Sequence, residues 1–332
     1  MQRWLFVAKR AAVVCTATLM LGCADTSAPS EPVPLVDVPP GFPEQVYPAD
    51  NHPTPDRVAL GKVLFNSTQL SRFQDVSCAS CHLQDHAFAD SRSVSPGTGG
   101  ALGTRNSPSL ANVGYYTHFM REGGVPTLEQ QIAVPLQEHA EFDFNMRQAV
   151  DRLRVDTTIQ RMAQAAYGRD FDAFVLTRSI AAFERTLVSG RSRADVGQLS
   201  AQEQQGKQLF MAERTACSGC HGGFLYTSMG FANNGALERY ADVGRMRLTK
   251  DRRDSNVFAI PSLRNVGVTA PYMHDGSVAT LRDVVDRYNR GGFAYANKDA
   301  RIRPLGLTDA ECQALVAFLQ TLTDEQFIGR TR

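Results

Sequence analysis

The sequence predicts a mostly α-helical protein made of two similar units, at residues 49–195 and 196–332. Three segments occur twice in the same order: residues 61–65 and 206–210 (GKVLF, GKQLF), 78–82 and 217–221 (CASCH, CSGCH), and 182–187 and 317–322 (AFxxTL). Such self-similarity indicates a duplicated structural unit. No alternation of apolar and polar residues runs long enough to predict a sheet. We expect each unit to contain an opening helix, a helix bearing the cysteines and a closing helix.

The repeated C-x-x-C-H segment predicts covalent haem attachment. Two thiols three residues apart lie on one helical turn, where they can form thioethers to the two vinyl groups of one haem. The following histidine can then ligate the iron. Zinc sites and thioredoxin-like dithiols also use C-x-x-C, but neither requires a histidine directly after both pairs. We therefore expect two covalent haem c groups, held by Cys78, Cys81, His82, Cys217, Cys220 and His221.

Several helices have recognisable starts. A Ser or Thr N-cap is strengthened by Pro at the first helical position, or by Glu three residues later in a capping box. Three such signals are present: Thr54-Pro55, Ser200-x-x-Glu203 and Thr308-x-x-Glu311. The first two begin the opening helices, and the third begins the closing helix of the second unit.

The N-terminus predicts export. Residues 1–22 place basic residues before a short apolar run, which is typical of a signal peptide. Cys23 follows Leu21-Gly22 and resembles the acylated first residue of a bacterial lipoprotein; an ordinary signal with an incidental cysteine is the alternative. Residues 23–48, rich in Pro and Ser, predict an extended linker or strap. The net charge of +1 gives no reason to expect nucleic acid as a partner.

Export agrees with haem attachment, because bacteria attach haem c outside the cytoplasm. We therefore expect a periplasmic protein. Its only contact with a membrane would be a lipid anchor at Cys23, since no other stretch is long and apolar enough to cross a bilayer.

The sixth ligand of each iron decides the functional class, because an electron carrier closes both axial positions while a peroxidase or oxidase leaves one open. The candidates after the first motif are His86, His118, His139, Met120 and Met146. We expect His86 one turn further along the haem helix, on the proximal side of the ring. No histidine occurs from 87 to 117, and the two methionines fit a hydrophobic core better. The first iron is therefore predicted to be open.

The sequence also resembles the bacterial di-haem cytochrome c peroxidases and their MauG-like relatives. The segments that carry the resemblance are LGKVLF, SCASCHLQDHAFAD, RNSPSLANV, TLEQQIAVP, CSGCH, IPSLRNVGVTAPYMHDGSVATLRDVVDRYNRGG and LVAFLQTLTD. The resemblance implies two cytochrome c-like domains with the haems near their interface. In the family the N-terminal haem binds hydrogen peroxide, the C-terminal haem passes electrons to it, and Ca²⁺ lies between the domains.

The resemblance assigns a distal pocket over the first haem to Gln131, Pro135 and Glu141. A positioned carboxylate can take a proton from peroxide and return it to the departing oxygen. A neutral amide can orient the bound oxygen. The alternative is that these are surface residues of a Glu- and Gln-rich stretch, like Glu129, Glu138 and His139 around them.

For the second haem, His/Met ligation is common in cytochromes c, which makes Met273 a candidate sixth ligand. The family instead places its ligand fourteen residues beyond the histidine that follows Met273, His274, and this chain has Tyr288 there. Cytochrome c peroxidases have Met there and MauG-like proteins have Tyr, so Tyr288 is favoured and Met273 is the alternative. In that alternative Tyr288 packs within an amphipathic helix at 281–288.

The family resemblance also implies a calcium site formed by Asn106 and the backbone carbonyls of Thr269 and Pro271, although Asn106 is also a common residue type before Ser-Pro in a turn. One position departs from the family: Arg121 stands where a tryptophan usually lies between the haems. An aromatic relay would then have to use one of three neighbours: Tyr115, Tyr116 or Phe119. The alternative is that electrons tunnel directly between the haems.

These expectations combine into a di-haem peroxidase of the MauG-like branch. The electron donor would be a small periplasmic cytochrome or a cupredoxin. Two alternatives remain: an oxidase that modifies side chains of a partner protein, and a di-haem electron carrier without catalysis.

Overall fold

The computed structural model describes Met1 and residues 35–329, so the predicted signal peptide and Cys23 lie outside the described residues. The elements between Leu35 and Gly329 are α1 Pro55–Phe65, α2 Cys78–Cys81, α3 Leu128–Gln131, α4 Ala133–Gln137, α5 Met146–Leu153, α6 Thr157–Tyr167, α7 Ala173–Glu184, α8 Ala201–Met211, α9 Cys217–Cys220, β1 Phe231–Ala232, α10 Met246–Thr249, β2 Phe258–Ala259, α11 Leu281–Arg290 and α12 Asp309–Gln320. The two strands pair antiparallel over two residues each. The prediction of a mostly helical fold is confirmed.

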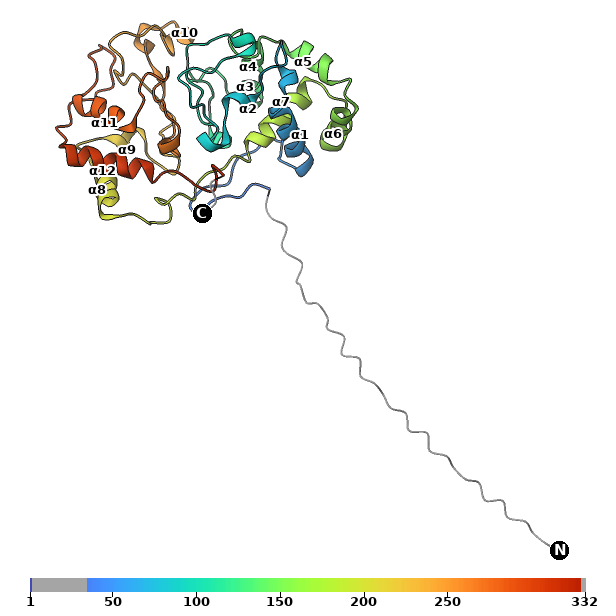
Figure 1. The fold of residues 1–332 in the computed structure, drawn as a ribbon, viewed down its shortest axis with the longest axis horizontal. Coiled ribbons are helices and arrows are strands. Elements are labelled where there is room, and N and C mark those ends of the chain that lie inside the picture. Colours follow the sequence, from blue (N-terminus) through green and yellow to red (C-terminus); the bar gives the residue numbers. More distant parts are fainter. Residues whose placement is uncertain (2–34, 330–332) are drawn as a thin grey trace. The chain divides into compact units, whose positions relative to one another are not determined.

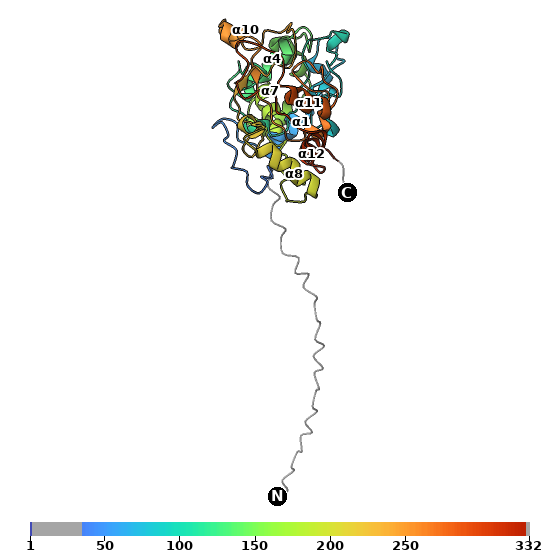
Figure 2. The ribbon, with the colours of Figure 1, turned by 90° about the vertical axis from the view of Figure 1, so that its left-hand side faces the viewer.

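The opening and closing helices of each half cross at a glycine. A Cβ atom at Gly61 of α1 would lie 1.9 Å from the carbonyl oxygen of Ser179 in α7. A Cβ atom at Gly206 of α8 would likewise lie 1.9 Å from the carbonyl oxygen of Ala314 in α12. Only glycine allows such close contact, which explains why the G-K-x-L-F segment recurs. Both views show α8 beside α12 (Figure 1, Figure 2).

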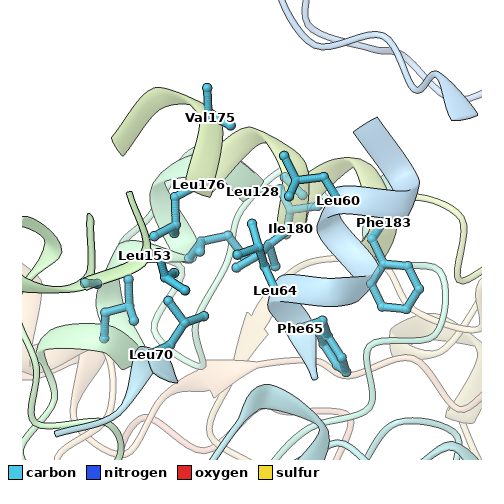
Figure 3. Packing of buried hydrophobic residues seen from close by; sticks show 14 of the residues in the cluster. Leu60, Leu64, Phe65, Leu70, Leu128, Leu153, Val175, Leu176, Ile180 and Phe183 are labelled. Carbon is cyan, nitrogen blue, oxygen red and sulfur yellow. The ribbon is translucent and has the colours of Figure 1, made fainter. Parts of the chain in front are cut away.

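Two hydrophobic cores form around these crossings. The first is built from residues between 60 and 187, and Figure 3 shows Leu60 and Leu64 of α1 beside Ile180 of α7. The Phe65 ring packs against Phe183, with ring centroids 5.1 Å apart. The second is built from residues between 194 and 322 and includes Phe210, Leu315 and Phe318. Figure 1 shows α1–α7 gathered on one side and α8–α12 on the other.

The predicted helix starts are confirmed. The Thr54 side chain accepts a hydrogen bond from the Arg57 backbone N–H, and Ser200 and Thr308 each form a capping box with the Glu three residues later. The haem helices are shorter than predicted, because α2 ends at Cys81 and His82 is its C-cap. His86 therefore does not share the helix of the cysteines; it lies in a separate 3₁₀ turn, Gln84–His86.

A further repeat, offset by 153 residues, precedes α3 in the first half and α11 in the second. It begins with the segments 108–114 (PSLANVG) and 261–267 (PSLRNVG). Asn112 and Asn265 both adopt left-handed backbone conformations, with φ of 63° and 61°, and each precedes a 3₁₀ turn. Met120 and Met273 are also left-handed, with φ of 66° and 74°. The backbone of the second half therefore follows that of the first through this region.

The connection between the halves is held by buried polar groups. Asn112 Nδ2 donates to the carbonyl oxygen of Ser189 at 2.9 Å, and Asn265 Nδ2 donates to Ser189 Oγ at 2.9 Å. Asp324 Oδ2 accepts from the backbone N–H groups of Gly190 and Arg191 at 3.0 and 2.9 Å. The two repeated asparagines and the C-terminal segment thus fix the same short connection.

The segment before α1 contacts both halves. Phe42 packs edge-on against Tyr115 of the first half and Phe224 of the second, with ring centroids 5.8 and 4.8 Å apart. Gln45 is buried and its Nε2 donates to the carbonyl oxygen of Arg185.

Candidate functional site

Each C-x-x-C-H segment forms one helical turn that presents both thiols together. The turns are α2 and α9, and none of the cysteines in the described part of the chain is in a disulfide. His82 Nδ1 lies 2.8 Å from the carbonyl oxygen of Phe88. His221 Nδ1 lies 3.1 Å from that of Pro261. Because Nδ1 can donate to a backbone carbonyl in each case, Nε2 remains free in both histidines and could ligate an iron.

Both imidazoles are suited to ligate a metal. Burial lowers the pKa of His82, and burial lowers the pKa of His221 to about 4. Both rings are therefore neutral near pH 7, as a nitrogen ligand must be.

An arginine anchors each haem turn. Arg92 Nη2 donates to the carbonyl oxygen of Ser80 at 3.0 Å and pairs with the buried Asp90 at 2.7 Å. In the second half, Arg301 Nη1 donates to the carbonyl oxygen of Gly219 at 2.7 Å and pairs with Asp299. The carbonyl before the second cysteine is held in the same way in both halves.

One cavity of about 790 Å³ connects the two turns, and all six residues of the two haem motifs line it. Paired thiols, a histidine with a free Nε2 and a cavity beside them are together what a covalent haem requires. The residues present fit two haem groups, one in each half.

The distal residues expected for the first haem line the same cavity. Gln131 ends α3 and Pro135 lies in α4, while Glu141 follows on the next loop with its side chain accessible in the cavity. The Glu141 side chain is exposed along the cavity, and desolvation by the protein around it, with the charge of Glu138 second, raises its pKa to about 7. A carboxyl group with this pKa can both accept and release a proton near neutral pH.

The residues around this pocket are not all on the surface. Glu138 and His139 are exposed, but Glu129 is buried. The Glu129 carboxylate pairs with Arg185 of α7 at 2.6 Å and accepts from Asn51 at 2.8 Å. The interpretation of the whole stretch as a solvated face is therefore wrong for Glu129.

Two of the five candidate sixth ligands of the first haem line the cavity, His118 and Met120. His86 and His139 instead pair with Asp85 and Asp143, and Met146 packs against the core as expected. Met120 differs from the expectation of a core residue: its sulfur lies 4.0 Å from Gln131 Nε2. The left-handed backbone at Met120 turns its side chain toward the haem cavity.

Both candidate ligands of the second haem reach the cavity as well. Asn234 Nδ2 donates to the Tyr288 hydroxyl at 3.0 Å, and it lies 3.8 Å from the sulfur of Met273. Burial raises the pKa of Tyr288 to about 12. The hydrogen bond from Asn234 acts in the opposite direction and partly offsets this rise, because it stabilises the charged form of Tyr288.

The 153-residue repeat relates the two haem pockets. Thr127 and Thr280 are the N-caps of α3 and α11, and the eighth residue after each cap is Pro135 and Tyr288, respectively. Helix α11 continues through this position, whereas the first half divides into α3 and α4. Proline has no group that can bind iron, so the position that offers a phenol in the second half offers none in the first.

The residues expected between the two haems differ in whether they line the cavity. Tyr116 and Phe119 line the cavity, whereas Tyr115 packs against Phe42 and Phe224 outside it. Arg121 also lines the cavity; burial, with repulsion from Arg105, lowers its pKa to about 10, so it stays cationic at neutral pH. The predicted calcium ligands, Asn106, Thr269 and Pro271, lie on the same cavity.

Comparison with known proteins agrees with these features. Residues 55–205 match the family model of di-haem cytochrome c peroxidase, and residues 203–323 match that of cytochrome c. The chain is 32% identical to the cytochrome-c peroxidase IdrP1 of Denitromonas iodatirespirans, covering 97% of this chain and 93% of that protein. It is 32% identical to the methylamine utilization protein MauG of Methylorubrum extorquens, covering 95% and 94%. The chain belongs to the di-haem cytochrome c peroxidase/MauG family.

Solved structures share this fold. A MauG-like protein associated with microbial copper homeostasis superimposes with a TM-score of 0.83 and 34% identity, over 88% of this chain and 96% of that one. The diheme peroxidase BthA of Burkholderia thailandensis gives 0.73 and 25%, over 86% and 91%. The predicted fold class and family are confirmed. Family membership makes the chain an oxidoreductase, and with two C-x-x-C-H motifs it implies two covalent haem c groups.

Within residues 35–329, no helix has the length and hydrophobicity needed to span a bilayer. Three residues of the site were not identified from the sequence. Arg92 and Arg301 act on turns 12 and 82 residues away, which no local pattern indicates. Asn234 could have been found only from its place after the second haem motif.

Proposed function

We propose that the protein reduces hydrogen peroxide at the His82 haem with electrons that arrive through the His221 haem. Haem, when bound, supplies an iron that binds peroxide and exchanges electrons. The overall reaction consumes one peroxide, two electrons and two protons and releases two waters. The observation that carries the proposal is the absence of a ligating side chain at Pro135, where the matching position of the second half has Tyr288.

The side chains around Pro135 have the chemistry that peroxide reduction requires. Glu141 can take a proton from the oxygen nearer the iron and return it to the departing oxygen. Gln131 Nε2 can donate a hydrogen bond that orients the bound molecule. The two act from different segments of one cavity, so peroxide entering it meets both groups.

The second haem is proposed to be closed by Tyr288, with Met273 as the alternative. Asn234, which contacts both, supports the phenolate. The proposed setting is the periplasm, with a small cytochrome or cupredoxin as the electron donor. A MauG-like oxidation of a partner protein uses the same site and differs in where the electrons originate.

The first test is the resting absorption and EPR spectrum of the protein with both haems bound. An open first iron gives a high-spin ferric signal that disappears when peroxide is added. Met120→Leu tests whether the sulfur of Met120, which lines this pocket, ligates the first iron. If it does not, the high-spin signal should be the same in this variant. Two low-spin haems in the wild type, with a high-spin signal created by Met120→Leu, would identify an electron carrier instead.

A further inference from the structure

The space between the two haem motifs already contains a cation, the guanidinium of Arg121. Its Nη2 donates to the backbone oxygen of Asn106 at 2.7 Å and lies 3.5 Å from Asn106 Oδ1. Asn106 is the one side-chain ligand expected for the inter-domain Ca²⁺. The guanidinium of Arg121 therefore contacts the same Asn106 oxygen atoms that would have to coordinate the Ca²⁺.

Asn106 is fixed in this orientation by its other contacts. Its Nδ2 donates to the carbonyl oxygen of Arg92 at 3.0 Å, and its backbone N–H donates to the carbonyl oxygen of His274 at 2.9 Å. The carbonyl oxygen of Arg121 accepts from the backbone N–H of Ala259 at 2.7 Å. Arg121 and Asn106 thus connect the first half to two segments of the second, as a bridging metal would.

The charges nearby do not favour an additional divalent cation. Arg105 is already paired with Glu122 at 2.8 Å and with Asp242 at 2.6 Å. The three predicted calcium ligands, Asn106, Thr269 and Pro271, supply amide and carbonyl oxygens and no carboxylate. Ca²⁺ takes six to eight oxygen ligands, and here it would lie beside a guanidinium in a site of low dielectric. The residues present do not fit calcium.

Arg121 itself lacks a carboxylate partner. Among the described residues no Asp or Glu oxygen lies within 4.0 Å of its guanidinium, and its Nε is buried without a hydrogen bond. The side chain lines the cavity that both haems would share. The propionate groups of haem are carboxylates, the anions that a guanidinium binds best.

We propose that the guanidinium of Arg121 replaces the inter-domain Ca²⁺ and pairs with haem carboxylates, so that this protein holds its two haem sites together without a divalent metal. This role requires bound haem but does not depend on peroxide being the substrate.

Calcium content is the direct test. The protein with both haems bound, purified through EGTA, is expected to contain less than one-tenth of a calcium per chain by elemental analysis. Titration with CaCl₂ should leave its absorption and EPR spectra and its melting temperature unchanged. One tightly bound calcium per chain, with a spectral change on its removal, would overturn the proposal.

Variants of Arg121 distinguish an effect of its positive charge on the haems from a purely structural role of the side chain. Arg121→Gln removes the cation beside both haems and is expected to lower the reduction potential of each, because a nearby positive charge favours the reduced iron. Arg121→Lys should keep both potentials close to those of the wild type. Arg247→Gln is the matched control, since Arg247 lines the same cavity but its charge is paired with Glu122 at 2.6 Å.

Equal potentials in Arg121→Gln and Arg247→Gln would contradict the assignment. If Arg121→Gln does not assemble with haem, the calcium measurement on the wild type still decides. Peroxide turnover is not a readout in either experiment, so the result is independent of the proposed reaction.

Discussion

Glu141 is the residue from which a pH dependence is expected. Its pKa is raised to about 7, and the base form is the one that accepts a proton from peroxide. The rate constant kcat/KM for peroxide should therefore fall as the pH drops below about 7, where Glu141 becomes protonated. Glu141→Gln should remove this acid limb and lower kcat/KM by about 10²–10⁴-fold, measured by oxidation of a reduced small cytochrome c.

Glu138→Gln is the companion variant, because the charge of Glu138 raises the pKa of Glu141. Without that charge the Glu141 pKa falls, so the acid limb should move to lower pH while the rate at pH 8 is preserved. An acid limb that stays in place in both variants would assign it to another group.

Tyr288 and Met273 can be distinguished at the second haem. Tyr288→Phe is expected to abolish the low-spin EPR signal of this haem, because the phenol oxygen that closes the iron is removed. Met273→Leu should leave the signal unchanged and serves as the control, since both side chains contact Asn234. The reverse result would assign His/Met ligation.

At the scale of elements, the glycine crossings should be the least tolerant positions of the helices. Gly206→Ala places a Cβ atom 1.9 Å from a backbone oxygen of α12, so the helices must separate. The free energy of unfolding should fall by at least about 1–3 kcal/mol, measured by denaturant titration of haem absorbance. The exposed neighbour Lys207→Ala is the control and should change it by less than about 0.5 kcal/mol. Equal stabilities would show that the crossing is not tight.

The helices also show which parts of the fold could be predicted from the sequence. Capping residues and duplicated segments predicted the major helices, because both signals are local. The His86 position was missed because the chain leaves the helix at His82, where no glycine or proline marks the end. Glu129 was missed because its partner Arg185 is 56 residues away. A charged residue with a distant partner cannot be told from an exposed one by its neighbours.

The correspondence between Pro135 and Tyr288 is encoded in the sequence itself, although neither residue type indicates it. The segments PSLANVG and PSLRNVG lie 153 residues apart, and extending them by count aligns the two positions. The turn anchors Arg92 and Arg301 had no such signal, because they come from different places in their halves.

At the scale of the whole molecule, Asp324 joins the C-terminal segment to the connection between the halves. Asp324→Ala would leave the buried N–H groups of Gly190 and Arg191 without an acceptor. The free energy of unfolding should fall by roughly 1–3 kcal/mol, and trypsin should cut after Arg191 or Arg193 faster than in the wild type.

Gln326→Ala is the control for Asp324→Ala, because Gln326 is an exposed residue of the same segment. Equal cleavage rates in the two variants would show that Asp324 does not hold the connection.

The position shared by Pro135 and Tyr288 bears on how such a protein can arise. Two copies of one haem unit begin as equals, each able to conduct electrons. On the proposed assignment, loss of one iron-binding side chain is enough to let one haem unit react with peroxide, while the other unit continues to transfer electrons. After a duplication, the two copies can then take different functions without a new catalytic framework. Replacing the side chain that closes the iron in one copy is sufficient.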